Sequence, residues 1–82
     1  MAHDDTAVAV IEVIARTCHA PTDEITLSST LNDDLGVDSL TMIEIAVDVE
    51  DEFGMRIEDD HVATLETVGD VVALVRSSSG AG

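Results

Sequence analysis

Ser39 is the side chain whose surroundings in this sequence most favour chemistry. It stands between Asp38 and Leu40, after a loop at 31–37 and before an acidic amphipathic segment that reaches Phe53. This order predicts a helix that starts at the serine, with Asp38 as its N-cap. The unpaired amides and positive dipole end of a helix favour a phosphate ester attached there. The sequence therefore indicates Ser39 as the attachment point for a phosphate-linked group.

Two other interpretations of Ser39 compete with this one. A serine at a helix start is commonly a structural residue. A serine nucleophile needs a general base and an oxyanion hole, and the sequence around Ser39 lacks the Gly-x-Ser-x-Gly pattern. The histidines His3, His19 and His61 lie in segments that we expect to face solvent. A serine hydrolase is therefore the less favoured interpretation.

The loop before Ser39 also contains Asn32, Asp33 and Asp34, whose oxygen atoms suit divalent cations. An EF-hand requires oxygen ligands at its first and last loop positions and glycine at the sixth. With Gly36 as the sixth residue, those ends fall on Leu31 and Met42. The match fails, so we expect no defined metal site and only a loose attraction of cations to a crowded field of anions.

Two long segments have helical periodicity. The first reaches from a cap at Asp4, Asp5 or Thr6 to a point before Pro21, and its apolar positions are Ala7, Val10, Ile11, Ile14 and Cys18. The second follows Ser39 and ends at Gly54, a residue suited to the left-handed position after a helix. Its apolar stripe is Met42, Ile45, Ala46, Val49 and Phe53.

The rest of the chain predicts two further helices and two irregular segments. A brief helix is expected within 58–64, and Thr67 to Asp70 reads as a capping box before a last helix that buries Val68, Val71, Val72 and Val75. The long connection at 20–38 should be packed down by Ile25, Leu27, Leu31 and Leu35. We predict a domain at 1–76 and a flexible tail at 77–82. The fold class is all-α: a small four-helix bundle of three longer helices and one short one, with a long first loop.

Charge and composition exclude several classes of function. The 82 residues include 18 acids and 3 arginines without lysine, and the formal net charge is -15. Such a chain repels nucleic acid and anionic membranes, and favours basic partner surfaces. Cys18 stands alone, so no internal disulfide can form, and we expect it to be a small core residue. With an acidic N-terminus and no long apolar run, we expect a cytoplasmic monomer without membrane insertion.

Acidic and apolar side chains share one surface of the second helix. Glu44, Asp48, Glu50, Asp51 and Glu52 have no basic residue within 39–53 to pair with, and like charges four residues apart weaken a helix by roughly 0.2–0.5 kcal/mol per pair. A solvated face explains such a run on its own. However, Leu40, Ile43 and Val47 lie off the core stripe, so this face also suits a basic, partly apolar partner.

Taken together, these residues resemble the acyl carrier proteins of fatty acid and polyketide synthesis. The resemblance covers about residues 31–75 and rests on Leu35-Gly36-Val37-Asp38-Ser39-Leu40, Glu44-Ile45-Ala46, Glu50-Asp51-Glu52-Phe53-Gly54, Ile57-Glu58-Asp59-Asp60 and Thr67-Val68-Gly69-Asp70. The family usually has proline after the isoleucine, where this chain has Glu58.

The resemblance implies that Ser39 accepts 4'-phosphopantetheine from coenzyme A by the action of a phosphopantetheinyl transferase. The thiol of that group would hold acyl chains as thioesters for acyltransferases, ketosynthases, reductases and dehydratases that carry basic docking patches. The recognition face for those partners would be Asp38, Leu40, Glu44, Val47, Asp48 and Asp51. The residues that line the acyl chain would be Ile43, Ala46, Val49, Ile57, Val62 and Leu65, although core packing explains the same side chains.

Alternatives to this function remain open. The main competitor is a small acidic protein-interaction or divalent-cation-binding module without covalent cargo, and a serine hydrolase ranks below it. Among carriers, the resemblance of the second helix to fatty-acid-type carriers favours fatty acid synthesis over polyketide and other secondary pathways.

Overall fold

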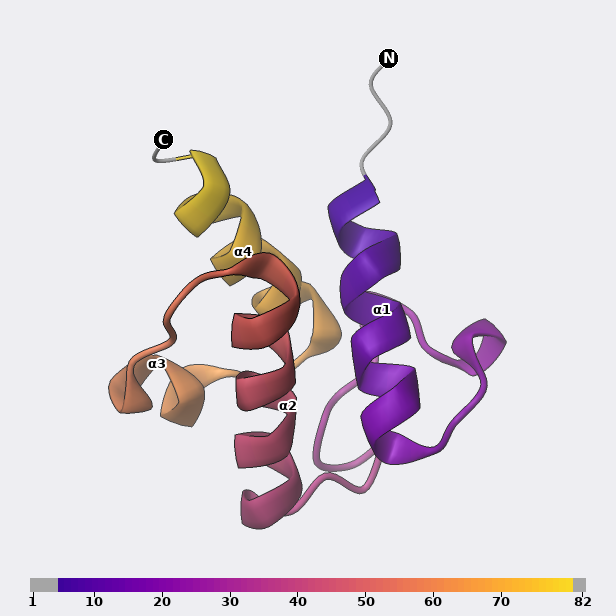
Figure 1. Cartoon of the computed structure of the whole chain (residues 1–82). Helices are drawn as coiled ribbons and strands as arrows, with labels where there is room; N and C mark the ends of the chain where they lie inside the picture. The colour runs from indigo at the N-terminus through magenta and orange to yellow at the C-terminus, as the bar shows by residue number, and fades with distance from the viewer. Residues whose placement is uncertain (1–4, 81–82) are drawn as a thin grey trace.

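Four helices form the fold, and the computed structural model describes residues 5–80 of it (Figure 1). The helices are α1 (Asp5–Cys18), α2 (Ser39–Phe53), α3 (Asp59–Thr64) and α4 (Val68–Gly80), with a 3-10 turn η1 (Thr22–Glu24) in the first loop. No strand occurs in this range; its nearest equivalent is an isolated bridge between Thr30 and Thr67. The predicted all-α bundle is confirmed.

The core is built almost entirely from branched aliphatic side chains. Helix α1 packs against both α2 and α4, and each contributes one apolar face. The most deeply buried large side chains are Val10, Val13, Ile14, Leu31, Ile45, Val49, Val68, Val71, Val72 and Val75. Burying one such side chain contributes roughly 1.5–3 kcal/mol. The core therefore does not depend on the lone aromatic residue, Phe53, which is half-buried.

Helix α1 ends in a left-handed turn rather than at a glycine. His19 has φ 57°, and the amide of Ala20 donates to the carbonyl of Ala15 at 3.0 Å. This pattern closes the last turn of the helix and leaves the His19 side chain exposed. At the other end, Asp5 and Thr6 are helical residues, and the proposed cap Asp4 lies outside the described residues.

Both ends of α2 match the sequence prediction. Asp38 is the N-cap, and its Oδ1 accepts a hydrogen bond of 2.8 Å from the amide of Thr41. Gly54 has φ 62°, and its amide donates to the carbonyl of Glu50. A residue with a Cβ is strained at such a positive φ, so glycine ends the helix with little conformational strain.

The long first loop is tied to the start of α4. The amide of Leu31 donates to Glu66 O at 2.8 Å, and that of Gly69 donates to Leu27 O at 2.8 Å. Ile25 and Leu31 are buried anchors as predicted, and Leu35 is half-buried. Leu27 was wrongly predicted as an anchor: its side chain is 45% exposed, and only its carbonyl group is used.

The last two helices follow the predicted capping signals. The amide of Asp70 donates to Thr67 Oγ1 at 3.1 Å, and the amide of Thr67 donates to Asp70 Oδ2 at 3.0 Å. This reciprocal pair is the predicted capping box. Helix α4 extends to Gly80, so residues 77–80 of the predicted tail are helical in this structure. Residues 81–82 lie outside the described range.

Candidate functional site

Ser39 is the first residue of α2, and its side chain is exposed. Val37 lies two residues before Ser39 and is buried, with 4% exposure. Its amide donates a hydrogen bond of 2.8 Å to the carbonyl of Leu31. Val37 is an anchor that the sequence analysis missed, because a single apolar residue in a loop has no period to mark it. It fixes the backbone just before α2, so the serine hydroxyl is presented from a rigid support.

Asp38 sets the electrostatics around the serine. Hydrogen bonds from the backbone and side chain of Thr41 hold the pKa of the Asp38 carboxyl below its usual range. The side chain is therefore an anion at neutral pH, and it already satisfies one amide at the helix start. A phosphate ester on Ser39 would share the positive helix end with this carboxylate, so the dipole would stabilise the ester less than it would beside a neutral cap.

A hollow of about 710 Å³ opens beside Ser39 between α2 and α3. Along α2 it is lined at helical spacing by Ser39, Met42, Ile43, Ala46, Val47 and Glu50, and across from them by Ile57, Val62, Ala63 and Leu65. From Ser39 to Glu50 this stripe runs roughly 16 Å along the helix axis. The hollow therefore starts at the serine and extends along most of α2.

The residues expected to line an acyl chain fall into two groups in this structure. Ile43, Ala46, Ile57, Val62 and Leu65 lie around the hollow. Val49 does not; it is fully buried in the core, and its exposed fraction is 0%. Met42, Val47 and Ala63 line the hollow but were not predicted for this role. Of the three, only Ala63 lies on α3, and the short polar pattern of that helix does not mark it.

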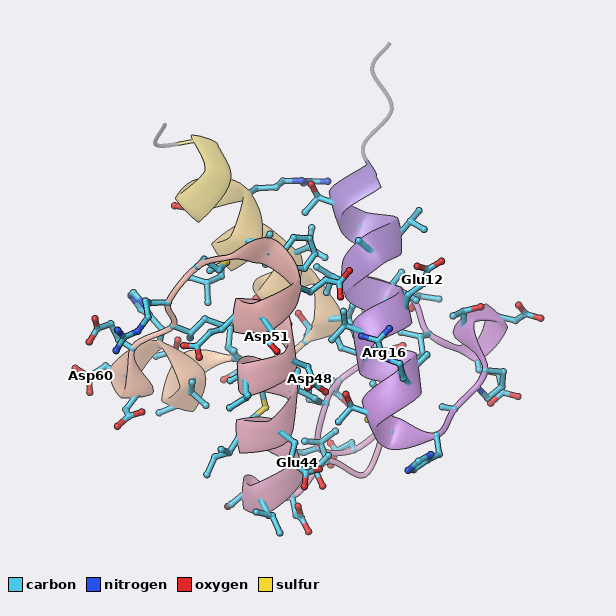
Figure 2. The ribbon with its side chains drawn as sticks, viewed as in Figure 1. Glu12, Arg16, Glu44, Asp48, Asp51 and Asp60 are labelled. Atoms are coloured by element: carbon cyan, nitrogen blue, oxygen red, sulfur yellow. The ribbon has the colours of Figure 1, made fainter. Side chains whose placement is uncertain are left out.

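The acidic face of α2 runs along one side of the molecule. Figure 2 shows Glu44, Asp48 and Asp51 along this helix, next to Arg16 of α1. Glu44 and Asp51 are exposed. The apolar side chains of Leu40, Ile43 and Val47 are 66%, 55% and 52% exposed. The predicted mixture of exposed acids and aliphatic side chains is present on this face.

Three of the acids in α2 have structural partners outside that helix. Asp48 is half-buried and accepts a hydrogen bond of 2.6 Å from the Thr17 hydroxyl of α1. Glu50 accepts one of 2.6 Å from the amide of Ile57. Glu52 lies 3.7 Å from the guanidinium of Arg16, in an exposed pair that contributes little to stability. These contacts reduce the set of acids that remain fully available to a partner.

The described residues offer Ser39 no catalytic machinery. His19 and His61 are exposed, on the end of α1 and on α3, and neither lines the hollow beside the serine. His3 lies outside the described residues. Cys18 was predicted to be a small core residue; it is half-buried and packs against the core, and burial raises the pKa of its thiol.

The acids of the first loop are the candidates for cation binding. Asp34 accepts a hydrogen bond of 2.8 Å from the amide of Thr30, so it closes a turn of the first loop. Within residues 5–80, no three His, Cys, Asp or Glu side chains are grouped to hold a metal ion. None of the described helices has the length and apolar character to span a bilayer.

Comparisons with known proteins identify the family. The family described as "Phosphopantetheine attachment site" matches residues 8–75. The acyl carrier protein of Exiguobacterium sibiricum is 43% identical over 77 residues, which cover 94% of this chain and 98% of that protein. The meromycolate extension acyl carrier protein of Mycobacterium tuberculosis is 41% identical over 73 residues, 89% of this chain but 64% of that protein.

A comparison with solved structures identifies the same family. A solved structure of a Mycobacterium tuberculosis protein, described as an acyl carrier protein, matches with a TM-score of 0.83 and 33% identity. The match covers 88% of this chain and 96% of the other. A phosphopantetheine attachment site implies a 4'-phosphopantetheine prosthetic group and, with it, a phosphopantetheinyl transferase and enzymes of fatty acid synthesis as partners. The chain therefore belongs to the acyl carrier proteins, non-catalytic proteins that carry acyl groups on phosphopantetheine.

Proposed function

We propose that Ser39 carries the 4'-phosphopantetheine group in this chain. The observation that supports this most strongly is the exposed Ser39 side chain on the first residue of α2, at one end of the hollow. The residues present fit the group, because the serine oxygen is accessible to a modifying enzyme and an elongated apolar space starts beside it. When attached, the group supplies a thiol that holds an acyl chain as a thioester.

The hollow is the proposed site for the acyl chain. Its apolar lining supports this role, with Ile43, Ala46, Ile57, Val62 and Leu65 as the predicted residues and Met42, Val47 and Ala63 as additions. Burial of a methylene group contributes about 0.8 kcal/mol. Val49 supports this wall from the core rather than contacting the chain.

The exposed face of α2 is the proposed docking surface for the partner enzymes. It consists of Asp38, Leu40, Glu44, Val47 and Asp51, with Asp48 at its edge because of the bond to Thr17. A phosphopantetheinyl transferase, acyltransferases, ketosynthases, reductases and dehydratases would approach it with basic patches. The excess of acid favours fast, electrostatically steered encounters and ready release, which suits a monomer that visits many enzymes.

Fatty acid synthesis is the proposed pathway, and polyketide synthesis is the second choice. The similarity to acyl carrier proteins, among them meromycolate extension carriers, supports cargo of the fatty acid type. The carrier unit is proposed to be residues 1–76. A cytoplasmic location belongs to the same proposal, and the single Cys18 supports it, because small secreted domains usually rely on disulfides.

Intact-mass measurement after incubation with coenzyme A, magnesium and a broad-specificity phosphopantetheinyl transferase tests the proposal. The wild type and Thr41→Ala, which removes a neighbouring hydroxyl group, should gain mass, whereas Ser39→Ala should not. If the wild type gains no mass, an acidic interaction module without cargo becomes the better explanation. Labelling of Ser39 by a fluorophosphonate without the transferase would instead indicate a hydrolase.

A further inference from the structure

Glu50 occupies an unusual place among the acids of α2, because it is the one acid of this helix that lines the hollow. It is the last residue of α2 along the hollow, and Ser39 is the first. Its Oε2 accepts a hydrogen bond of 2.6 Å from the amide of Ile57, which lies seven residues further along the chain. One carboxylate thus joins the end of α2 to the segment that leads into α3.

The segment held by this bond has few other attachments. It begins at Gly54, whose left-handed conformation turns the chain away from α2, and it ends at Glu58, whose side chain makes no capping bond at the start of α3. Helix α3 has six residues, and none of them is fully buried. The side chain of Ile57 is the buried anchor, with 7% exposure.

The bond lies at the end of the hollow that is opposite the serine. Both of its partners line the hollow, so a chain that extends from Ser39 along α2 meets them last. To continue further, an acyl chain would have to separate the carboxylate from the Ile57 amide. Leaving either of these polar groups unpaired against a hydrocarbon chain is unfavourable.

We infer that Glu50 is a positioning residue that holds Ile57 at the end of the hollow and limits the length of acyl chain that the hollow accommodates. This inference rests on the proposed function, because it requires a chain attached at Ser39. The bond itself is present in the unmodified protein, so its existence can be tested without the prosthetic group.

The first measurement is hydrogen exchange of the Ile57 amide in the unmodified chain. The Glu50→Ala variant should exchange at least about tenfold faster than the wild type at this amide, because a charge-assisted bond is lost. Glu50→Gln, which retains an acceptor oxygen, should restore part of the protection. Glu52→Gln is the matched control, because Glu52 lies on the same helix and pairs with Arg16. Equal exchange in the wild type and Glu50→Ala would overturn the inference.

The second measurement uses the modified protein, loaded with acyl groups from butanoyl to tetradecanoyl. Cleavage of each thioester by hydroxylamine reports how well the chain is sheltered. In Glu50→Ala, longer acyl chains should be protected from cleavage than in the wild type. Each pair of additional buried methylenes would slow cleavage roughly tenfold. Butanoyl cleavage should not change, and the conservative Glu50→Gln variant should lie closer to the wild type than Glu50→Ala does.

An identical dependence on chain length in the wild type and Glu50→Ala would contradict the role of Glu50 and leave Ser39 as the attachment residue. Failure to load the wild type at Ser39 would contradict both the proposed function and this inference. Circular dichroism of Glu50→Ala should show unchanged helix content, since alanine is the strongest helix former.

Discussion

The hydroxyl group of Thr17 on α1 donates a hydrogen bond of 2.6 Å to Oδ2 of Asp48 on α2. The same hydroxyl lies 3.0 Å from the carbonyl oxygen of Val13, so it joins the last turn of α1 to the middle of α2. Asp48 therefore holds two helices together, while Glu44, one turn earlier on α2, remains exposed. Two acids that look equivalent in sequence have different roles.

Charge reversal at these two acids should separate docking from stability. Glu44→Lys should slow phosphopantetheinyl transfer several-fold or more at low ionic strength, because a steering charge is inverted, and leave the unfolding transition unchanged. The rate difference should shrink in high salt. Initial rates across a salt series, with urea unfolding of the same variant, check this. A loading rate equal to that of the wild type at low salt would count against the docking face.

Asp48→Lys should instead destabilise the fold. The reversal removes the acceptor of the Thr17 bond, and hydrogen bonds to charged groups contribute about 1.5–3 kcal/mol. Thr17→Val, which preserves shape and removes only the hydroxyl, should lower the free energy of unfolding by about 1–2 kcal/mol. Glu44→Gln is the control, with an expected change within about 0.5 kcal/mol. Urea denaturation measures all three, and a Thr17→Val variant as stable as the wild type would remove the proposed link between α1 and α2.

Substitution of Gly54 should affect stability through the backbone alone. A Cβ at this position would have no neighbour within 4 Å, so the cost arises from φ 62° and not from a clash. Gly54→Ala should therefore lower the free energy of unfolding by about 1 kcal/mol, and Gly54→Asn by less, because asparagine tolerates the left-handed region. Thermal unfolding of both variants tests the order, and an alanine variant that is more stable than the asparagine one would contradict it.

The capping box at the start of α4 should make the folding stability of the protein depend on pH. Hydrogen bonds from the amides of Glu66 and Thr67 hold the pKa of the Asp70 carboxyl below its usual range. Because the folded-state pKa is the lower one, this contribution is fully present above the unfolded-state value of about 3.9 and is lost as the pH falls through the folded-state value.

Urea unfolding of the wild type and Asp70→Asn from pH 6 downward measures this contribution. The stability difference in favour of the wild type should disappear as the pH falls below the folded-state pKa of Asp70. Asp60→Asn, which removes one exposed charge from α3, corrects for the general relief of repulsion. A difference that stays constant across this pH range would show that the ionised form of Asp70 is not the stabilising one.

Local signals allowed much of this fold to be predicted from the sequence. Asp38, Gly54 and the Thr67–Asp70 pair act on amides within a few residues of themselves, so their residue types are enough to place the ends of α2 and the start of α4. The exposure of Ser39 was also predicted from a local signal, namely its position at the start of α2. The apolar spacing of α2 correctly separated buried Ile45 and Val49 from exposed Ile43 and Val47.

Features that depend on distant contacts were not predictable in this way. The roles of Leu27 and Val37 depend on how an irregular loop crosses the bundle, and no periodicity records that path. The partners of Asp48 and Glu50 come from α1 and from the segment before α3. Their sequence neighbours therefore gave no indication that these two acids differ from the exposed ones beside them.

The assignment of the prosthetic group to Ser39 is tested most directly by locating the modification within the chain. After treatment with coenzyme A, magnesium and the transferase, the protein should be digested and its peptides fragmented in a mass spectrometer. We expect one phosphopantetheine group, on the peptide that contains Ser39 and at that residue. A group found on any other residue, or none at all after treatment with an active transferase, would contradict this assignment.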